Sequence, residues 1–531
     1  MNPRKPEAPQ LDSPVPIRVW IGYASVLLAI VLLIVDYTIV ETNIPDLVRD
    51  FELSVDEIGT VFTGYLAVAA AFMIPAGKLA DRLGRRSLFL SGIAIYAAGS
   101  LLTGLAWDFW SLLAGRLLQG LSLATVLPTG LGLLNSTFPP QHPSRQRALG
   151  LWAIAIGVAA ALGPLIGGAL AVTASWRIAF VAGVPLAALA ATGVRLGLPE
   201  GARLTAKPFD MGGLSLLVLA AGTLVVVADR GDRWGIETIA LLLTGAVSAM
   251  AVFAWIEARR ARAGLDVVAL FALFRARTFA VGSVTAALMS CGDLGFQLVL
   301  PFFTGLVFGY NPLNVGLVLA AYGIGIGLGG AIAELACRRY DERTVAVIAI
   351  GALPITLLAL IPLFGPHGSE WAMALLLAVY GAAWGLAYAI LVNVIFRDVP
   401  ESASAMAGGI QSSMRLLAGA LSAAMLTAVF SGVSASRLDA VGNATQREQA
   451  IQMTSDWHFR KCHARCATIG PSDAAEIGAA YSIGATATLA AAAGLSACAF
   501  GVGLLLPRRP RPSADRELLA GSGTGQPTGS P

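Results

Sequence analysis

Long apolar runs recur along almost the whole chain and limit its fold more than any other feature. From about residue 19 to residue 506, polar segments separate apolar stretches of roughly 18 residues or more, each able to cross a hydrocarbon layer as a helix. Because backbone groups in lipid must be hydrogen-bonded internally, and because the runs do not alternate as strands do, helices are the expected spanning form. Charged residues make up 13% of the chain, against roughly 25% in a soluble domain. We therefore predict an all-helical, multi-pass membrane protein.

The apolar runs divide into about fourteen predicted spans. They lie near residues 19–41, 57–76, 87–106, 110–134, 148–172, 177–198, 211–228, 236–256, 278–308, 313–336, 344–364, 370–396, 404–430 and 477–506. The seventh and eighth are less distinct than the others, because they are shorter and flank the charged segment 229–235.

The placement of basic residues predicts the orientation of the chain. Most of the 36 Lys and Arg residues fall in segments that face the cytoplasm if the N-terminus does, which is the positive-inside pattern. Both termini are therefore expected in the cytoplasm. The net charge of +4 indicates orientation, and no nucleic-acid partner is expected. The polar N-terminal segment and the long first apolar run do not fit a cleaved signal peptide, and the C-terminal tail is typical of disorder.

The largest predicted extramembrane element is an outer loop at residues 431–476. It contains WHFRKCHARC, in which Cys462 and Cys466 lie beside two histidines. A metal site is one interpretation, but the spacing matches no strong zinc pattern. We favour an exposed polar loop whose two thiols can pair in an oxidising compartment. No metal or cofactor is predicted.

A compact charge cluster, GKLADRLGRR at residues 77–86, separates the second span from the third. A looser version, GGAIAELACRRYDER at residues 329–343, follows the tenth span. Such a repeat implies two related halves, as in transporters built from parallel repeats. The first cluster resembles the loop signature of the major facilitator superfamily, and the matching residues are Gly77, Asp81, Arg82, Gly84, Arg85 and Arg86.

Three further stretches narrow this resemblance. GRLLQGLSLATVLPTG at residues 115–130 resembles the fourth-span signature, and GVAAALGPLIGGAL at 157–170 resembles the fifth-span antiporter signature. VDYTIVETNIPDL at 35–47 is similar to the first-span signature of the fourteen-span drug:proton antiporters, although Glu41 stands where that family usually has Asn. The resemblance implies a major facilitator fold of two six-helix bundles with two extra central spans.

That fold predicts five regions of the chain. They are a cytoplasmic N-tail (1–17), an N-terminal six-helix bundle (18–200), a linker with two extra spans (201–265), a C-terminal six-helix bundle (266–506) and a disordered cytoplasmic tail (507–531). We expect the charged loop to act as a cytoplasmic gate. In this hypothesis Asp81 pairs with the other half and latches the outward-open state.

The fifth span has the composition expected of a gating helix. Small residues spaced three to five apart allow close helix approach, and a proline removes a backbone hydrogen bond and bends the span. The residues concerned are Gly157, Gly163, Pro164, Gly167 and Gly168. Tight packing without motion is the alternative interpretation.

Charged residues within spans are costly and therefore indicate function. Asp36 and Arg116 are expected at a similar depth, about 8–12 Å from the outer ends of the first and fourth spans. A carboxylate balanced between burial and a neighbouring Arg can exchange protons; a static ion pair is the alternative. Asp293, in the ninth span, is the expected counterpart of Asp36, and Arg415 can neutralise it or belong only to packing.

Residues near these charges are candidates for a substrate cavity. We select Phe296, Gln297 and Asn393, although aromatic residues also serve as interface anchors. Two acids with aromatic faces would suit lipophilic cations.

Together with the resemblance, these patterns predict a monomeric inner-membrane transporter that exports hydrophobic or cationic small molecules in exchange for protons by alternating access. Its partners are the substrate, protons and membrane lipid. The chain has no G-x-x-x-x-G-K-[ST] run, which argues against an ATP-driven pump. Export of a metabolite or siderophore, and import of a solute, stay open. A membrane-embedded sensor or enzyme is disfavoured, because no intramembrane metal cluster or soluble domain is evident.

Overall fold

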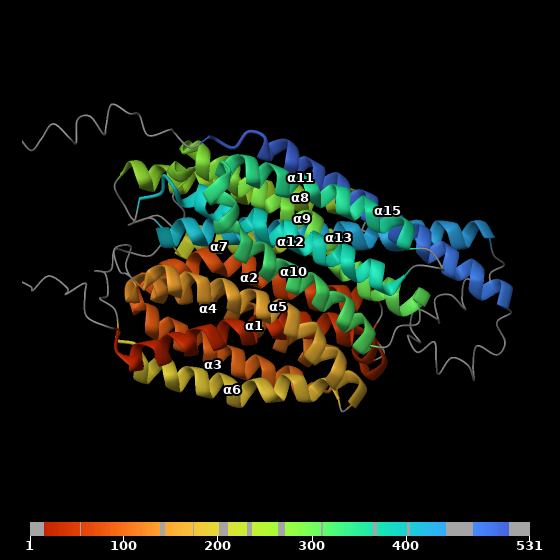
Figure 1. The fold of residues 1–531 in the computed structure, drawn as a ribbon, viewed down its shortest axis with the longest axis horizontal. Coiled ribbons are helices and arrows are strands. Elements are labelled where there is room, and N and C mark those ends of the chain that lie inside the picture. Colours follow the sequence, from red (N-terminus) through yellow and green to blue (C-terminus); the bar gives the residue numbers. More distant parts are fainter. Residues whose placement is uncertain are drawn as a thin grey trace, which may run out of the picture.

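Figure 1 shows the computed structural model of the chain. The structure describes residues 15–51, 53, 55–138, 144–173, 175–200, 211–230, 236–263, 271–308, 312–364, 369–400, 404–441 and 471–508. Most of the predicted outer loop and of both tails, including Cys462 and Cys466, lies outside these residues.

Fourteen long α-helices, of 19 to 38 residues, make up most of the described chain. They are α1 (Ile17–Phe51), α2 (Val55–Leu83), α3 (Arg85–Gly104), α4 (Phe109–Thr137), α5 (Arg145–Thr173), α6 (Trp176–Gly197), α7 (Met211–Arg230), α8 (Ile236–Arg262), α9 (Arg277–Phe308), α10 (Pro312–Arg339), α11 (Glu342–Leu360), α12 (Glu370–Phe396), α13 (Ser404–Val441) and α15 (Pro471–Gly503). Two short 3-10 helices, η2 (Phe271–Arg275) and η3 (Ile361–Leu363), accompany them.

Each long helix coincides with one predicted span. Twelve contain a described segment long and apolar enough to cross a membrane by length and composition. The all-helical fold class is thereby confirmed, and a count of twelve to fourteen spans agrees with the sequence. Helices α13 and α15 extend into the range 431–476, since α13 continues to Val441 and α15 begins at Pro471.

Polar side chains and one glycine fix several helix boundaries. Asp108 accepts a hydrogen bond from the Ser111 amide at 2.8 Å and forms a capping box that starts α4. Ser175 caps α6 in a similar way. Gly84 separates α2 from α3 with a φ of 95°, a conformation that glycine adopts without the steric cost of a Cβ.

The helices form two bundles that meet along two seams. Helices α1–α6 pack mainly on one another, and α9–α13 pack with α15 (Figure 1). One seam joins α5 to α10, and the other joins α2 to α13. The extra helix α7 packs on both α2 and α13 and on α8, so the extra pair is attached at the second seam.

Glycine pairs bring α10 and α12 into close contact. Gly325 and Gly329 of α10 face Ala378 and Ala382 of α12, while Gly381 and Gly385 of α12 face Tyr322 and Ile326 of α10. The small-xxx-small spacing on both helices lets the two backbones approach closely.

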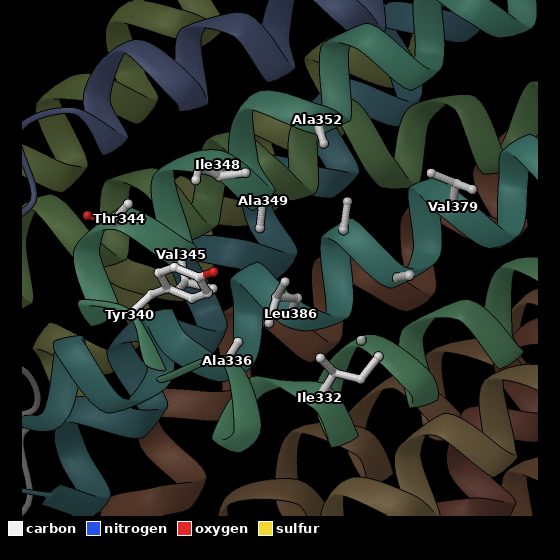
Figure 2. Close-up of a pocket in the computed structure, with 13 residues that line it drawn as sticks. Ile332, Ala336, Tyr340, Thr344, Val345, Ile348, Ala349, Ala352, Val379 and Leu386 are labelled. Carbon is white, nitrogen blue, oxygen red and sulfur yellow. The ribbon is translucent and has the colours of Figure 1, made fainter. Parts of the chain in front are cut away.

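An apolar groove lies over this contact. It has a volume of about 470 Å³ and is lined from α10, α11 and α12. Figure 2 shows exposed side chains at its rim, including Ile332, Tyr340 and Ile348. Its lining is almost wholly aliphatic and contains no carboxylate, which suits contact with lipid chains.

We predict that Gly329→Ala destabilises the protein. A Cβ at this position would overlap the Ala382 carbonyl oxygen, and overpacking of a tight contact costs about 1–3 kcal/mol. Gly330→Ala is the matched control, because its Cβ would meet no atom within 4 Å. Thermal unfolding in detergent should show a lower midpoint for Gly329→Ala only. Equal midpoints would contradict this account of the α10–α12 contact.

Candidate functional site

An ion pair is buried in the first bundle. Arg116 of α4 donates through Nη1 to a carboxylate oxygen of Asp36 on α1 at 2.9 Å. The side chains are 0% and 3% exposed, respectively. The structure thus brings together two residues that the sequence placed at one depth.

Polar side chains from α3 and α4 surround this pair. Gln119 donates to Asp36 at 2.6 Å and to the Ser100 hydroxyl at 2.9 Å, and it accepts from Arg116 at 2.8 Å. Thr103 donates to the Gln119 carbonyl at 3.3 Å. Each carboxylate and amide oxygen therefore has a donor, which a charge in a low-dielectric interior requires.

Two glycines allow this arrangement. A Cβ at Gly99 would meet the Gln119 side chain and the Gly115 carbonyl at 2.9 Å. A Cβ at Gly115 would meet the Thr103 amide at 2.8 Å. Without side chains at these two points, α3 and α4 come close enough for Gln119 to reach both Ser100 and Asp36.

Aromatic rings of α1 and α2 border the same site. The Arg116 guanidinium carbon lies 4.5 Å from the centre of the Tyr65 ring, a distance at which cation–π attraction contributes. Tyr65 in turn stacks on Tyr37, with 5.6 Å between ring centres. The charge pair is therefore covered by rings on the side of α2.

The second bundle holds its own buried acid. Tyr322 of α10 donates to Asp293 of α9 at 2.7 Å, and Gln297 donates to the Tyr322 hydroxyl at 3.2 Å. Asp293 is 4% exposed. Tyr380 of α12 stacks near Tyr322, with 6.0 Å between ring centres. Arg415 of α13 lies close enough to act on Asp293 electrostatically, so Asp293 has hydroxyl partners and a more distant cation.

The structure describes the side chains of two of the three predicted cavity residues. Gln297 joins the Asp293 cluster. Asn393 is exposed in the last turn of α12, and the side chains of Phe296 and Glu41 lie outside the described part of the structure. Ser100 and Gln119 were not selected as site residues from the sequence. Gln119 could have been identified by its position one helical turn after Arg116, which places both side chains on one face of α4.

The charged loop binds its own bundle. Arg86 donates to the Leu198 carbonyl at 2.6 Å and to Glu200 at 3.2 Å, beyond the end of α6. Arg85 donates to the Gly132 carbonyl of α4 at 3.0 Å. Glu200 also accepts from the Ser87 amide at 3.3 Å, which caps the N-terminus of α3 with a carboxylate.

The remaining loop residues lie at the end of α2. Gly77 is buried in this helix, and Arg82 lies in its last turn. The Asp81 side chain lies outside the described part of the structure, so the proposed latch stays a prediction.

The second bundle repeats part of this arrangement. Arg343, in the first turn of α11, donates to the Leu504 carbonyl beyond α15 at 2.6 Å. This is the counterpart of the bond from Arg86, at the start of α3, to Leu198 beyond α6. Arg397 and Glu342 form an ion pair between the ends of α12 and α11. In each bundle, therefore, an arginine at the start of the third helix donates to a backbone carbonyl just beyond the sixth helix.

The predicted gating helix α5 has two glycine faces. Gly163 and Gly167 lie against Thr38 and Ile39 of α1, beside Asp36. Gly157 and Gly168 lie against α10 of the other bundle, and the Pro164 carbonyl lies against Gly316 of α10. Helix α5 therefore contacts the acid-bearing helix of one bundle and a seam helix of the other.

A two-bundle helical membrane protein with a buried acid on the first helix of each half, Asp36 and Asp293, has the architecture of a secondary transporter built from repeats. The chain matches the Major Facilitator Superfamily over residues 26–423, and it belongs to that superfamily. It is accordingly a transporter and not an enzyme.

Relatives and solved structures agree with this assignment. Multidrug resistance protein Stp of Mycobacterium tuberculosis (strain CDC 1551 / Oshkosh) is 28% identical, over 82% of this chain and 81% of Stp. The Tetracenomycin C resistance and export protein of Streptomyces glaucescens is 30% identical, over 88% and 83% of the two chains. A bacterial homologue of the lysosomal transporter Spinster has a TM-score of 0.62 at 19% identity, covering 93% of this chain and 98% of its own, which shows the shared fold.

We predict that Arg116→Gln lowers the free energy of unfolding by about 3–5 kcal/mol, because it leaves a buried carboxylate without its cation. The double variant Asp36→Asn/Arg116→Gln should lose less than this single variant. Denaturant titration in detergent would measure both. A double variant that is less stable than Arg116→Gln alone would contradict the pairing.

We also predict that Glu200→Gln destabilises the protein by about 1 kcal/mol, the usual loss when a helix cap is weakened. The matched control is Glu334→Gln, whose ion pair with Arg338 is exposed and therefore contributes little. The same titration would compare them. If both variants lose equal stability, the capping role of Glu200 is wrong.

Proposed function

We propose that the protein is a proton-coupled exporter of small organic molecules that works by alternating access. The single observation that carries this proposal is the pair of buried acids, Asp36 and Asp293, one in each bundle. Ionisable residues within spans are expensive to keep. A carboxylate that meets different surroundings in two conformations can bind a proton in one and release it in the other.

Asp36 is the stronger candidate for proton coupling. In this conformation Arg116 and Gln119 hold the carboxylate. Protonation would remove its attraction to Arg116 and free that cation within the bundle. A conformation in which Arg116 has another partner would then be favoured, which couples the proton to a structural change.

Helix α5 suits the transmission of that change. Its glycines contact α1 beside Asp36 on one face and α10 on the other. Because glycines have no side chains that interdigitate, two helices that contact each other at glycines can slide past one another. We infer that rocking of the two bundles takes place at the α5–α10 and α2–α13 seams, with α5 as the gating helix.

The names of the relatives support export as the direction. The Streptomyces glaucescens relative is named for resistance and export, and Stp for multidrug resistance. A substrate class of hydrophobic or cationic drugs, an inner-membrane location and cytoplasmic termini form part of this proposal. The alternative substrate is an endogenous metabolite, because a resistance phenotype alone would not exclude its export.

The test is dye efflux from a host that lacks its own major pumps, with ethidium and fluorescein as separate probes. We expect export by the wild-type protein to stop when an uncoupler collapses the proton gradient. Asp36→Asn and Asp293→Asn should each reduce the efflux rate at least tenfold, because neither can carry a proton. Asp108→Asn is the matched control, since Asp108 caps α4 outside the proposed site and Asn is an equally good cap.

Two results would overturn the proposal. Efflux that persists with the uncoupler would exclude proton coupling. Efflux that is unchanged in both acid variants, with protein levels equal to wild type, would exclude these acids as the carriers.

A further inference from the structure

Helix α12 carries a ladder of aromatic rings on one face. Tyr380, Trp384 and Tyr388 follow one another at intervals of four residues, which aligns them on a helix. Trp384 and Tyr388 stack with 5.0 Å between ring centres and 21° between planes. At the other end of the ladder, Tyr380 stacks near Tyr322. We call these three residues of α12 the aromatic ladder.

Three buried hydrogen-bond donors of α12 and α13 have no acceptor among the residues that the structure describes. They are Nε1 of Trp384, Nε2 of Gln411 and Nε of Arg415. Trp384 is 8% exposed and Gln411 is 3% exposed. Buried polar groups almost always find a partner, and each of these three N–H groups would be satisfied by an acceptor oxygen.

The donors and the ladder belong to one surface. The Arg415 guanidinium carbon lies 5.4 Å from the centre of the Tyr388 ring, so Arg415 reaches from α13 to α12. Gln411 precedes Arg415 by one helical turn and faces the same side of α13. This surface therefore combines flat rings with N–H donors. The positive charge of Arg415 lies at the Tyr388 end, and Asp293 lies beside Tyr322 at the Tyr380 end.

We propose that the aromatic ladder, Gln411 and Arg415 bind a planar aromatic molecule whose edge carries an anionic oxygen, such as an aromatic carboxylate or an acidic phenol. Rings of the ligand would stack on the ladder, as aromatic pairs do in offset geometry. Its oxygens would accept from Trp384, Gln411 and Arg415, and bonds from charged donors to anions are the strong ones.

The charge of Arg415 favours an anionic ligand at this site, whereas the buried acids Asp36 and Asp293 would favour a cationic one. At the Tyr388 end of the ladder a lipophilic cation would meet the like charge of Arg415, whereas an anion would meet opposite charge. Asp293 lies at the other end, beside Tyr322. This proposal rests on the proposed function, because it assigns a substrate class to the exporter. It concerns binding alone, so it can fail or hold without proton coupling.

The test compares two probes that share one ring system and differ in charge. They are 9-anthracenecarboxylate and 9-(aminomethyl)anthracene, titrated by fluorescence onto the full-length protein in nanodiscs, with empty nanodiscs subtracted. We expect the carboxylate to bind at least tenfold more tightly than the amine. Arg415→Gln should weaken carboxylate binding roughly ten- to a hundredfold, the effect of losing a bond to a charged group.

Trp384→Phe serves as the second variant, because it keeps a ring but removes Nε1. It should weaken carboxylate binding by roughly fivefold, as for one hydrogen bond. Trp371→Phe is the matched control, since Trp371 lies at the start of the same helix and is 85% exposed. Equal thermal unfolding midpoints for the three variants and wild type would establish that binding losses are local.

The proposal is overturned if the amine binds as tightly as the carboxylate, or if Arg415→Gln and Trp384→Phe both leave carboxylate affinity unchanged. Charge-selective binding together with uncoupler-insensitive efflux would exclude the proposed proton coupling and support this site. Proton-coupled efflux without charge-selective binding would exclude this site and support the proposed proton coupling.

Discussion

The ion pair between Asp36 and Arg116 is the interaction on which the first bundle depends. Both side chains are removed from solvent, and the cost of taking two charges out of water is recovered only when geometry and hydrogen bonding are complete. Four helices contribute to that geometry and satisfy the carboxylate, while Nε and Nη2 of Arg116 have no hydrogen-bond partner among the described residues. α1 supplies the acid and α4 the base, α3 supplies hydroxyls, and α2 supplies the Tyr65 ring. The need to satisfy this pair fixes how these helices are packed.

The two bundles follow one plan but treat their acids differently. Each has an acid on its first helix and an arginine that fastens the start of its third helix to the end of its sixth. In the first bundle the acid is paired directly with a cation, whereas in the second it accepts from Tyr322. Under the proposed mechanism, the fastened ends would make each bundle a stiffer unit and concentrate movement at the seams between them.

The sequence predicted the helices and the Asp36–Arg116 pair because both follow from simple rules. Apolar run length defines a span, and two opposite charges at equal depth in lipid attract each other. It did not predict the hydrogen-bonding role of Ser100, since one hydroxyl among many carries no local signal of its partner. Gln119 lies one helical turn after Arg116, but that position does not identify Asp36 as its partner. The contact of Arg86 with Glu200 was missed for a related reason. The chain separates them by more than three helices, and only the packing of α3 on α6 brings them together.

Under the proposed mechanism, the α5–α10 seam is where the two acids can influence one another. Asp36 lies beside the α1 residues on which Gly163 and Gly167 of α5 pack. On the other side of the seam, Gly323 of α10 packs against Ala160 of α5, and its neighbour Tyr322 holds Asp293. Asp36 is therefore on a helix that packs on α5, and the partner of Asp293 is next to a residue of the seam. In the proposed mechanism, a shift of α5 relative to α10 would move the surroundings of both carboxylates at once, which is the physical requirement for coupling a proton to the exchange of inner and outer access.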